Sequence, residues 1–256
     1  MGKNDPLDNT LLCLVGEQFF YYGLLNAEGN IHKSDQIKIN SDFSFYHSPE
    51  TISTFLSNSL ESLDFKKIKI GIVNQWFSIV PIELSKQESK YWTPKPKGDL
   101  KVDFHIDTLD QLQIAYFIPT ELKNKLLSIH DDVSFHHLVS ANLKGHETEE
   151  GVHSYKINGL QFLQVIDKQK IIYSNLVKSK TVLSQLYYSL LAFHVHEKDP
   201  HQIPFYTTTS ESDLNQELST YIKQVHNVTS SFKQTHESNL TNEYLYQLEK
   251  LDLCAS

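Results

Sequence analysis

The feature that most constrains this chain is a hairpin pattern that occurs once in each half. Residues 16–20 read GEQFF and residues 159–163 read GLQFL, and both stretches lie at the first predicted hairpin turn of their half. After each hairpin the chain continues with a third strand and then alternates helix and strand. Because an internal repeat indicates stacked copies of one unit, the sequence predicts two tandem lobes, each with the order β-β-β-α-β-α.

Apolar runs and turn residues place the elements of the first half. Strands are predicted at 11–15, 19–25, 31–39, 68–73, 77–81, 101–106, 112–118 and 133–139. Ser48 and Pro49 are typical of a helix start. Apolar residues then recur at helical spacing through residue 64, namely Ile52, Phe55, Leu56, Leu60 and Leu63. A short helix is predicted from Pro119, whereas the polar, proline-containing residues 85–99 predict an exposed connection.

Residues 145–151, which read GHETEEG, mark the predicted boundary between the lobes. We therefore expect an N-terminal lobe at 8–147 and a C-terminal lobe at 148–256. In the second lobe Asn158-Gly159 predicts a type I′ hairpin turn. Its predicted elements are strands at 155–157, 160–166, 170–177 and 204–208, a helix at 180–196, a helix capped by Ser212-Asp213 with Leu214, Leu218, Tyr221, Ile222 and Val225 on one side, and an amphipathic segment at 240–251.

This order of elements, with three apolar features, resembles a bacterial family of unknown function that has the actin-like ATPase (ribonuclease H-like) fold. The features are Phe77–Pro81 after the fourth strand, the helix that contains Leu186-Tyr187-Tyr188, and the strand and helix at 204–225. The resemblance covers nearly the whole chain. It implies an α/β fold of two lobes, with mixed sheets flanked by helices, and a nucleotide site in the cleft between the lobes.

In actin-like ATPases the first hairpin of each lobe carries an Asp-x-Gly pattern. The resemblance implies that the glycine lets backbone amides approach phosphate and that the aspartate organises a magnesium ion. Laid on these hairpins, the pattern falls on Cys13-Leu14-Val15 and on Lys156-Ile157-Asn158. A lysine in place of the aspartate would repel the cation. Residues 10–16 and 153–159 contain no aspartate in any register.

The sequence therefore predicts degenerate phosphate loops. Their equivalents are Cys13, Val15, Gly16, Lys156, Asn158 and Gly159. The glycine pair on the adenosine side is missing too, since strand 204–208 runs into Thr209-Ser210-Glu211. We expect no catalytic, cofactor-binding or metal-binding residue, and a non-catalytic scaffold for protein–protein contact. The alternative is a divergent nucleotide-binding or phosphotransfer protein that uses other side chains in the interlobe cleft.

Charge and residue counts argue against several partner classes. The net charge is −8 and all 23 basic residues are lysines, so sequence-specific nucleic-acid binding, which favours arginine, is not expected. The glycine motifs of dinucleotide sites, Walker loops and nucleophile elbows are absent. Two distant thiols, Cys13 and Cys254, and no signal peptide predict the reducing cytoplasm. The apolar runs are too short for a membrane span, so the expected partner is a protein, with the oligomeric state left open.

Two polar clusters allow a metal-binding and a simpler interpretation. Asp103, His105 and Asp107 alternate with apolar residues on one predicted strand, which suits a metal site but also the solvated face of an amphipathic strand, the interpretation we favour. The histidine-rich residues 130–137 would need ligands from distant segments to form a metallohydrolase site. A third group, His194, His196 and His201, does not have the HExxH spacing.

Aromatic residues offer one candidate contact. Phe19-Phe20-Tyr21-Tyr22 is predicted to be strand core and not a platform for stacking bases. Trp92 lies in the predicted exposed connection, and tryptophan is enriched at binding hot spots. Trp92 is therefore the predicted surface contact residue.

Overall fold

The structure is a computed structural model and describes residues 9–38, 44–60, 65–110, 112–144, 149–209, 211–235 and 240–254. The chain divides into two compact units. The first unit comprises Met1–Gly145, Phe232–Asn239 and Leu248–Ser256, and the second comprises His146–Ser231 and Leu240–Gln247. No helix among the described residues is long and apolar enough to cross a membrane.

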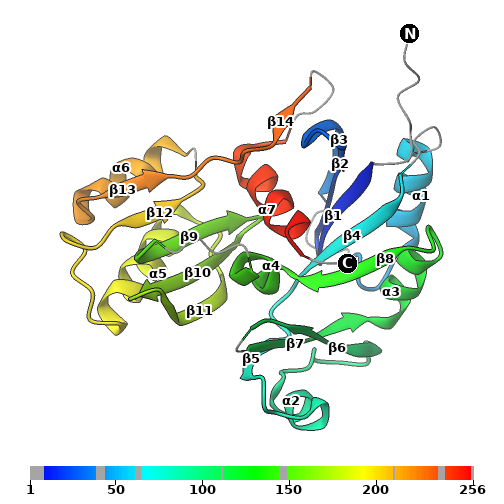
Figure 1. Cartoon of the computed structure of the whole chain (residues 1–256), viewed down its shortest axis with the longest axis horizontal. Helices are drawn as coiled ribbons and strands as arrows, with labels where there is room; N and C mark the ends of the chain where they lie inside the picture. Colours follow the sequence, from blue (N-terminus) through cyan, green and yellow to red (C-terminus); the bar gives the residue numbers. More distant parts are fainter. Residues whose placement is uncertain are drawn as a thin grey trace. The chain divides into compact units, whose positions relative to one another are not determined.

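A six-stranded mixed sheet forms the centre of the first unit, in the order β14-β3-β2-β1-β4-β8 (Figure 1). Its strands are β1 (Thr10–Gly16), β2 (Phe19–Leu25), β3 (Asn30–Lys38), β4 (Lys67–Val73), β8 (Val133–His137) and β14 (Lys233–Gln234). β1, β4 and β8 are parallel neighbours, whereas β2 is antiparallel to β1 and to β3. β1 and β2 are buried along their whole length, which explains their nearly unbroken apolar sequences.

Helix α1 (Glu50–Leu60) covers one face of this sheet. Its Phe55 ring lies edge-on to Phe20 and to Tyr22, with ring centroids 6.1 and 6.0 Å away. Because side chains alternate between the two faces of a strand, these two β2 residues share one face. The predicted aromatic core at residues 19–22 is therefore confirmed, since all four side chains are buried.

The last residues of helix α7 (Asn242–Asp252) pack on the opposite face of the same sheet. There Leu248 lies over Gly23 and Leu251 over Gly71. A Cβ atom at Gly71 would lie only 2.7 Å from a methyl carbon of Leu14 on the neighbouring strand. A side chain at Gly71 would therefore force Leu14 to move, whereas Leu251 of the helix would be at ordinary contact distance, 3.4 Å.

A buried lysine holds the carboxyl end of α7. The Lys69 ammonium donates hydrogen bonds to the backbone carbonyls of Asp252 and Cys254, the latter at 2.8 Å, and forms an ion pair of 3.2 Å with the Asp252 carboxylate. The last carbonyls of a helix have no partner within it and carry partial negative charge, so a cation is stabilising there. This explains a lysine inside an otherwise apolar strand.

A second, antiparallel sheet of the first unit has the order β5-β7-β6. Its strands are β5 (Phe77–Pro81), β6 (Val102–Thr108) and β7 (Leu112–Pro119), and the adjoining helices are α2 (Lys86–Trp92), α3 (Thr120–Leu127) and α4 (Leu138–Lys144). In sequence the sheet is inserted between β4 and β8, so these two neighbouring parallel strands are joined by a long connection.

The second unit contains a five-stranded sheet in the order β11-β10-β9-β12-β13. Its elements are β9 (Gly151–Ile157), β10 (Leu160–Asp167), β11 (Lys170–Lys178), β12 (Phe205–Thr207), β13 (Val225–Asn227), α5 (Val182–Val195) and α6 (Ser212–Tyr221). In chain order the strands lie 3-2-1-4-5, as β3-β2-β1-β4-β8 do in the first unit. The predicted α/β class with mixed sheets flanked by helices is confirmed.

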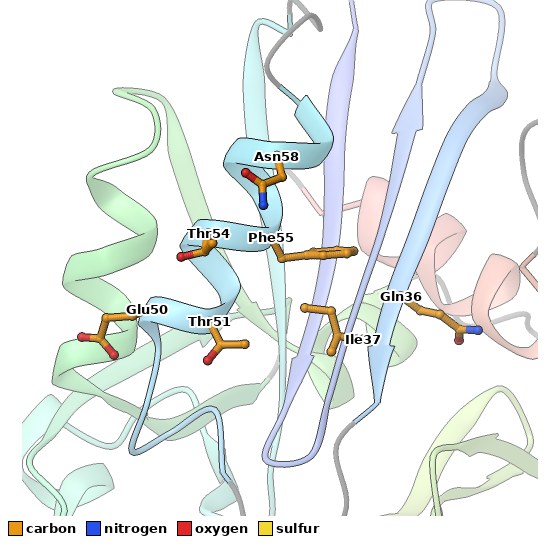
Figure 2. Close-up of a pocket in the computed structure, with 7 residues that line it drawn as sticks. All are labelled: Gln36, Ile37, Glu50, Thr51, Thr54, Phe55 and Asn58. Carbon is orange, nitrogen blue, oxygen red and sulfur yellow. The ribbon is translucent and has the colours of Figure 1, made fainter.

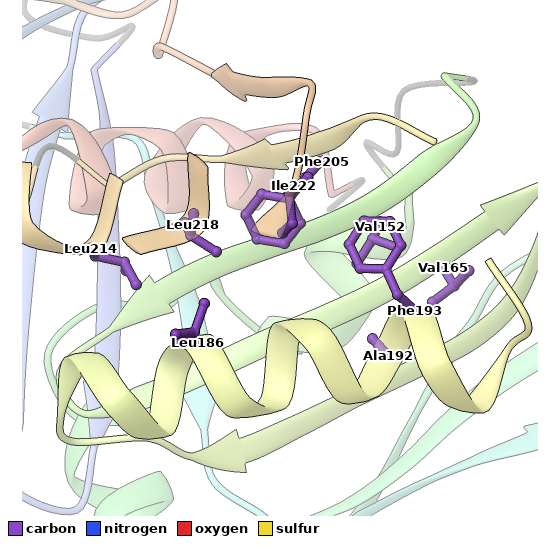
Figure 3. Packing of buried hydrophobic residues seen from close by; sticks show 9 residues of the cluster. All are labelled: Val152, Val165, Leu186, Ala192, Phe193, Phe205, Leu214, Leu218 and Ile222. Carbon is purple, nitrogen blue, oxygen red and sulfur yellow. The ribbon is translucent and has the colours of Figure 1, made fainter. Parts of the chain in front are cut away.

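Apolar side chains of the sheet and of α5 and α6 form the core of the second unit (Figure 3). The cluster consists of Val152, Val165, Leu186, Ala192, Phe193, Phe205, Leu214, Leu218 and Ile222. The α6 residues predicted to share a buried side mostly do so, but Tyr221 is largely exposed. Val225 lies in β13 and not in the helix, which ends at Tyr221 because the backbone of Ile222 is extended.

Three further expectations need correction. Residues 85–99 are exposed as predicted, but they include helix α2, which a capping box between Ser85 and Glu88 stabilises. The strand predicted at 133–139 ends at His137, where α4 begins. Helix α6 is preceded by Glu211 and not capped by Ser212-Asp213. The end of the predicted helix at residues 61–64 lies outside the described residues.

Candidate functional site

The predicted phosphate-loop positions of the first unit lie in a closed, apolar hairpin. Cys13 and Val15 are fully buried in β1, paired with Tyr22 and Phe20 across the hairpin. Burial raises the pKa of the Cys13 thiol far above its usual value, so the group stays neutral. Gly16 ends β1, and a Cβ atom there would lie 2.1 Å from the Phe19 ring. These residues present no charge and no free polar side chain.

The corresponding hairpin of the second unit ends in a charged pair. The ammonium of Lys156, on β9, forms an ion pair with the carboxylate of Glu211 just before α6. Asn158 and Gly159 have φ of 42° and 75°, as a type I′ turn requires, so that predicted turn is confirmed. The Gly159 carbonyl accepts a hydrogen bond of 2.8 Å from the Ser179 amide. The pairing with Glu211 was not foreseen, because it joins residues far apart in sequence.

Asp107 on β6 is hydrogen-bonded to three other elements of the first unit. It accepts hydrogen bonds from the His137 amide at 2.7 Å, from the Ser140 hydroxyl, and from the Tyr116 hydroxyl at 3.2 Å. The Nδ1 atom of His136 lies 3.6 Å from it. Its side chain is only 11% exposed. The interpretation of this strand face as solvated is therefore wrong at Asp107, because β8 and α4 cover it.

The other members of the same alternation lie in different surroundings. Asp103 accepts hydrogen bonds from Lys123 at 2.9 Å and Thr120 at 3.1 Å; burial opposes its ionisation, but these two partners outweigh that effect and lower its pKa. Burial lowers the pKa of His105, whose ring packs between Tyr116 and Phe135. The three residues of the alternation thus do not converge on a common point.

His137 is buried as a neutral imidazole. Its Nε2 atom lies 3.0 Å from the Asn74 carbonyl, and its Nδ1 atom accepts a hydrogen bond of 3.2 Å from the Val139 amide. The second contact leaves no room for a proton on Nδ1, so Nε2 carries the hydrogen. Burial lowers its pKa to about 4, although the Asn74 carbonyl and Asp107 act in the opposite direction.

The remaining histidine candidates do not come together. His130 packs against the Phe65 ring and accepts a hydrogen bond from the Asp132 amide. His194 lies in the last turn of α5, and the amide of His201 bonds to Asp199. Across the described ranges of the chain, no group of three or more His, Cys, Asp or Glu side chains is placed to hold a metal ion.

A shallow groove lies between α1 and β3 in the first unit (Figure 2). It has a volume of about 620 Å³ and is lined by Gln36, Ile37, Glu50, Thr51, Thr54, Phe55 and Asn58. Glu50 is its single ionisable side chain among these lining residues. Its other polar lining residues are neutral amides and hydroxyls, so the groove brings together no pair of acidic, basic or nucleophilic groups that would point to a reaction.

Trp92 is exposed, as the sequence predicts. The residue is 66% exposed, and the neighbouring Tyr91 is 82% exposed. The two rings are in edge-to-face contact, with centroids 5.7 Å apart. These are the two aromatic side chains of α2, which lies against β5 and β7.

The comparisons with known proteins place this architecture in a family. A family model described as "Protein of unknown function (DUF3822)" matches residues 4–225. The chain belongs to this family. The expectation of a family of unknown function is therefore confirmed for the DUF3822 chain. No curated protein sequence matches it.

The DUF3822 chain is similar to several solved structures over nearly its whole length. A protein of Bacteroides thetaiotaomicron VPI-5482, described as having an actin-like ATPase fold and unknown function, is 15% identical with a TM-score of 0.72, covering 99% of this chain and 100% of that one. A chain of the PilM–PilN type IV pilus biogenesis complex is 10% identical, with a TM-score of 0.60 and coverage of 94% and 97%.

A third neighbour is the cytoplasmic domain of EpsL, an inner membrane component of the type II secretion system of Vibrio cholerae. It is 10% identical to the DUF3822 chain, with a TM-score of 0.53 and coverage of 97% and 96%. At such low identities the likeness shows the fold. It confirms the predicted actin-like ATPase (ribonuclease H-like) fold.

Proposed function

We propose that this DUF3822 protein is a non-catalytic scaffold for protein–protein contact, built on the actin-like fold. The observation that carries the proposal is the ion pair between Lys156 and Glu211. By the resemblance, Lys156 stands where an actin-like ATPase has the aspartate that organises magnesium. Here that position holds a cation, and Glu211 from the same unit already neutralises it.

The first-unit hairpin supports the same proposal for a different physical reason, which is burial. The position that the resemblance assigns to the aspartate there, Cys13, is fully buried with a neutral thiol. A carboxylate at this place would lose its hydration without gaining a partner, which costs several kcal/mol. Neither hairpin therefore offers an acidic group in the place that the resemblance assigns to it.

The protein-contact half of the proposal is supported by analogy with two structural neighbours. One comes from a complex of two named proteins, PilM and PilN, and the other is described as a component of a secretion system. Both are thus described as parts of larger assemblies. Since fold alone does not determine function, this analogy needs a direct test.

The competing function is nucleotide binding or phosphoryl transfer by other side chains of the same region. Lysine binds phosphate as a point charge, so Lys156 could take a phosphate in place of Glu211. The two functions differ in a simple observable. A ligand that binds only the folded protein at about 100 times its Kd stabilises it by about 2.7 kcal/mol, which raises Tm by roughly 5–10 °C in a protein of this size.

The test is a thermal-denaturation series with ATP, ADP and GTP, each with magnesium and with EDTA, on the wild type and on Lys156→Gln. We expect the same Tm with and without nucleotide in both proteins. A rise of several degrees in the wild type that Lys156→Gln abolishes would establish the competing function at this hairpin. A rise in both proteins would place a nucleotide site elsewhere and would equally contradict the proposal.

We further propose that lobes 8–147 and 148–256 arose by duplication. We also propose that the protein is cytoplasmic. Its partner, in this proposal, is a protein and not a nucleic acid or a membrane. The shared strand order 3-2-1-4-5 supports duplication. Both cysteines are buried free thiols, which suits a reducing compartment. Expressing each lobe separately and measuring its cooperative unfolding tests whether the two fold on their own. Because β14 and the carboxyl end of α7 belong to the first unit, the first lobe is also expressed with residues 232–256 fused to it.

A further inference from the structure

Helix α2 exposes two large aromatic rings side by side. Tyr91 and Trp92 are 82% and 66% exposed and contact each other edge to face. Aromatic side chains of this size dominate binding energetics when a partner covers them, because they bury much apolar area and have few rotatable bonds. An adjacent exposed pair is thus a candidate anchor for a partner.

The backbone that carries these rings is held in place. Ser85 and Glu88 form a reciprocal capping box at the start of α2. At its end the buried Thr93 hydroxyl donates to the Ser89 carbonyl at 2.7 Å, and the Ser78 hydroxyl of β5 donates to the Trp92 carbonyl at 2.9 Å. A preorganised anchor loses less conformational entropy on binding than a mobile one.

The surroundings of the rings are strongly basic. Residues 85–101 contain five lysines and two acidic residues in a chain whose net charge is −8. All five lysines are exposed, and within the described part of the chain none of their ammonium groups forms an ion pair. One of the two acids, Glu88, already accepts hydrogen bonds from Ser85.

We propose that this surface binds an acidic segment of a protein partner that also carries an aromatic or aliphatic side chain. We call it the lysine–aromatic patch and define it by Lys86, Lys90, Tyr91, Trp92, Lys95 and Lys97. The lysines match the negative charge of the segment, and the rings receive its apolar side chain. The inference rests on the proposed scaffold function and names the docking surface that the scaffold uses.

The charge distribution favours a protein segment over a nucleic acid. The patch contains no arginine, and the chain as a whole would repel a long polyanion. A short acidic peptide meets only the local positive potential. At about 0.1 M salt, charges more than about 10 Å away are largely screened.

The test selects peptides of about a dozen residues from a random displayed library against the full chain and measures their affinity. Peptides that bind the patch are expected to be acidic with at least one apolar residue. Their Kd is expected to rise roughly 10- to 100-fold in Trp92→Ser, as at other tryptophan hot spots. It is also expected to rise when salt is increased from about 0.1 to about 1 M, because the Debye length falls from about 10 to about 3 Å.

The matched control is a second exposed apolar pair, on α5 of the second unit. Leu183 and Tyr187 are 75% and 57% exposed and lie one helical turn apart. Leu183→Ser/Tyr187→Ser should leave the affinity of the selected peptides unchanged. Unfolding curves of both variants check that each is folded, which is expected because Trp92, Leu183 and Tyr187 are all exposed.

Several outcomes would overturn the inference. If the selected peptides are neutral or basic, or if they lose affinity in the α5 variant and not in Trp92→Ser, the patch is not the docking surface, although the scaffold function stands. If no peptide binds, the inference fails and the scaffold function stands, since short peptides do not represent a folded partner. If vesicles with anionic lipid, or single-stranded oligothymidine, bind more tightly than any peptide and lose binding in Trp92→Ser, the patch serves a membrane or a nucleic acid. Nucleotide-dependent stabilisation would contradict the proposed function alone.

Discussion

One polar cluster in each unit shows how differently polar side chains are enclosed. In the first unit the Asp107 carboxylate and the His137 imidazole are enclosed, and each is held by partners from other elements. In the second unit Lys156 and Glu211 form their ion pair at a partly exposed position. Removing an enclosed polar side chain lowers the free energy of unfolding strongly, because its buried partners lose their hydrogen bonds. At the surface the loss is small, because water takes the place of the removed partner.

The two hairpin positions that the resemblance assigns to an aspartate differ in the same way. At Cys13 burial excludes a charge, so the surroundings would have to change before a carboxylate could be placed there. At Lys156 the surroundings tolerate a charge, which here is positive. Mutations at these two positions therefore distinguish a site where burial excludes a charged side chain from a site that tolerates one.

The largest effect is expected for Cys13→Asp, which puts a carboxylate without a partner among buried apolar side chains. It should lower the free energy of unfolding by roughly 4 kcal/mol or more, measured by urea denaturation. Cys13→Ala, which removes one heavy atom and adds no charge, should cost only about 1 kcal/mol.

The variant of the second unit to compare with Cys13→Asp is Lys156→Gln, which loses only a partly exposed ion pair. Its expected cost is about 1 kcal/mol or less, and it should shrink at high salt. Similar losses for Cys13→Asp and Lys156→Gln would abolish the distinction between the two hairpins.

The next largest effect is a loss of stability in acid caused by His137. Its pKa is about 4 in the folded protein and near 6.5 when unfolded, so between these values the unfolded chain binds more protons. The free energy of unfolding should therefore fall as the pH is lowered from 6.5 to 4, by roughly 3 kcal/mol from this group.

The control for this pH dependence is His137→Gln, whose amide can donate to the Asn74 carbonyl but does not titrate. The variant should be less stable than the wild type at pH 7.5, and the difference should narrow as the pH falls through the same range. A difference that stays constant from pH 7.5 to 4 would show that His137 is not buried in its neutral form.

The sequence predicts elements well where the signal is local. The Asn158-Gly159 turn is fixed by two residues that accept positive φ, and the apolar runs of β1 and β2 correspond to buried strands. Helix α2 also has a local signal, the Ser85 and Glu88 spacing of a capping box, which the polar composition around it conceals.

Long-range pairing is what the sequence does not reveal. The alternation on β6 is compatible with a solvated face, and only the arrival of β8 and α4 encloses Asp107. Lys156 and Glu211 are likewise brought together by the fold. Even the hairpin match is offset by two residues, since one turn is Glu17-Gln18 and the other is Asn158-Gly159. The similarity of the units therefore lies in strand order and not in matched residues.

A smaller contrast, of about 1 kcal/mol, separates the two hairpin glycines that the sequence match aligns. A Cβ atom at Gly16 would lie 2.1 Å from the ring of Phe19, which is buried and must move within a packed core. Gly16→Ala should therefore cost about 2 kcal/mol. At Gly159 the nearest atom is a methylene carbon of the flexible Lys180 at 3.2 Å, so the cost is only that of alanine at φ of +75°, about 1 kcal/mol.

A double-mutant cycle identifies the cause of the larger loss. If the Phe19 ring is responsible, then Gly16→Ala combined with Phe19→Leu should cost less than the sum of the two single variants, because the smaller side chain makes room for the methyl group. Additive losses would show that the Phe19 ring is not the cause. Gly29→Ala measures the cost of alanine at positive φ alone, since its φ is +79° and no atom lies within 4 Å of the added carbon. Its loss should match that of Gly159→Ala, and only Gly16→Ala should respond to Phe19.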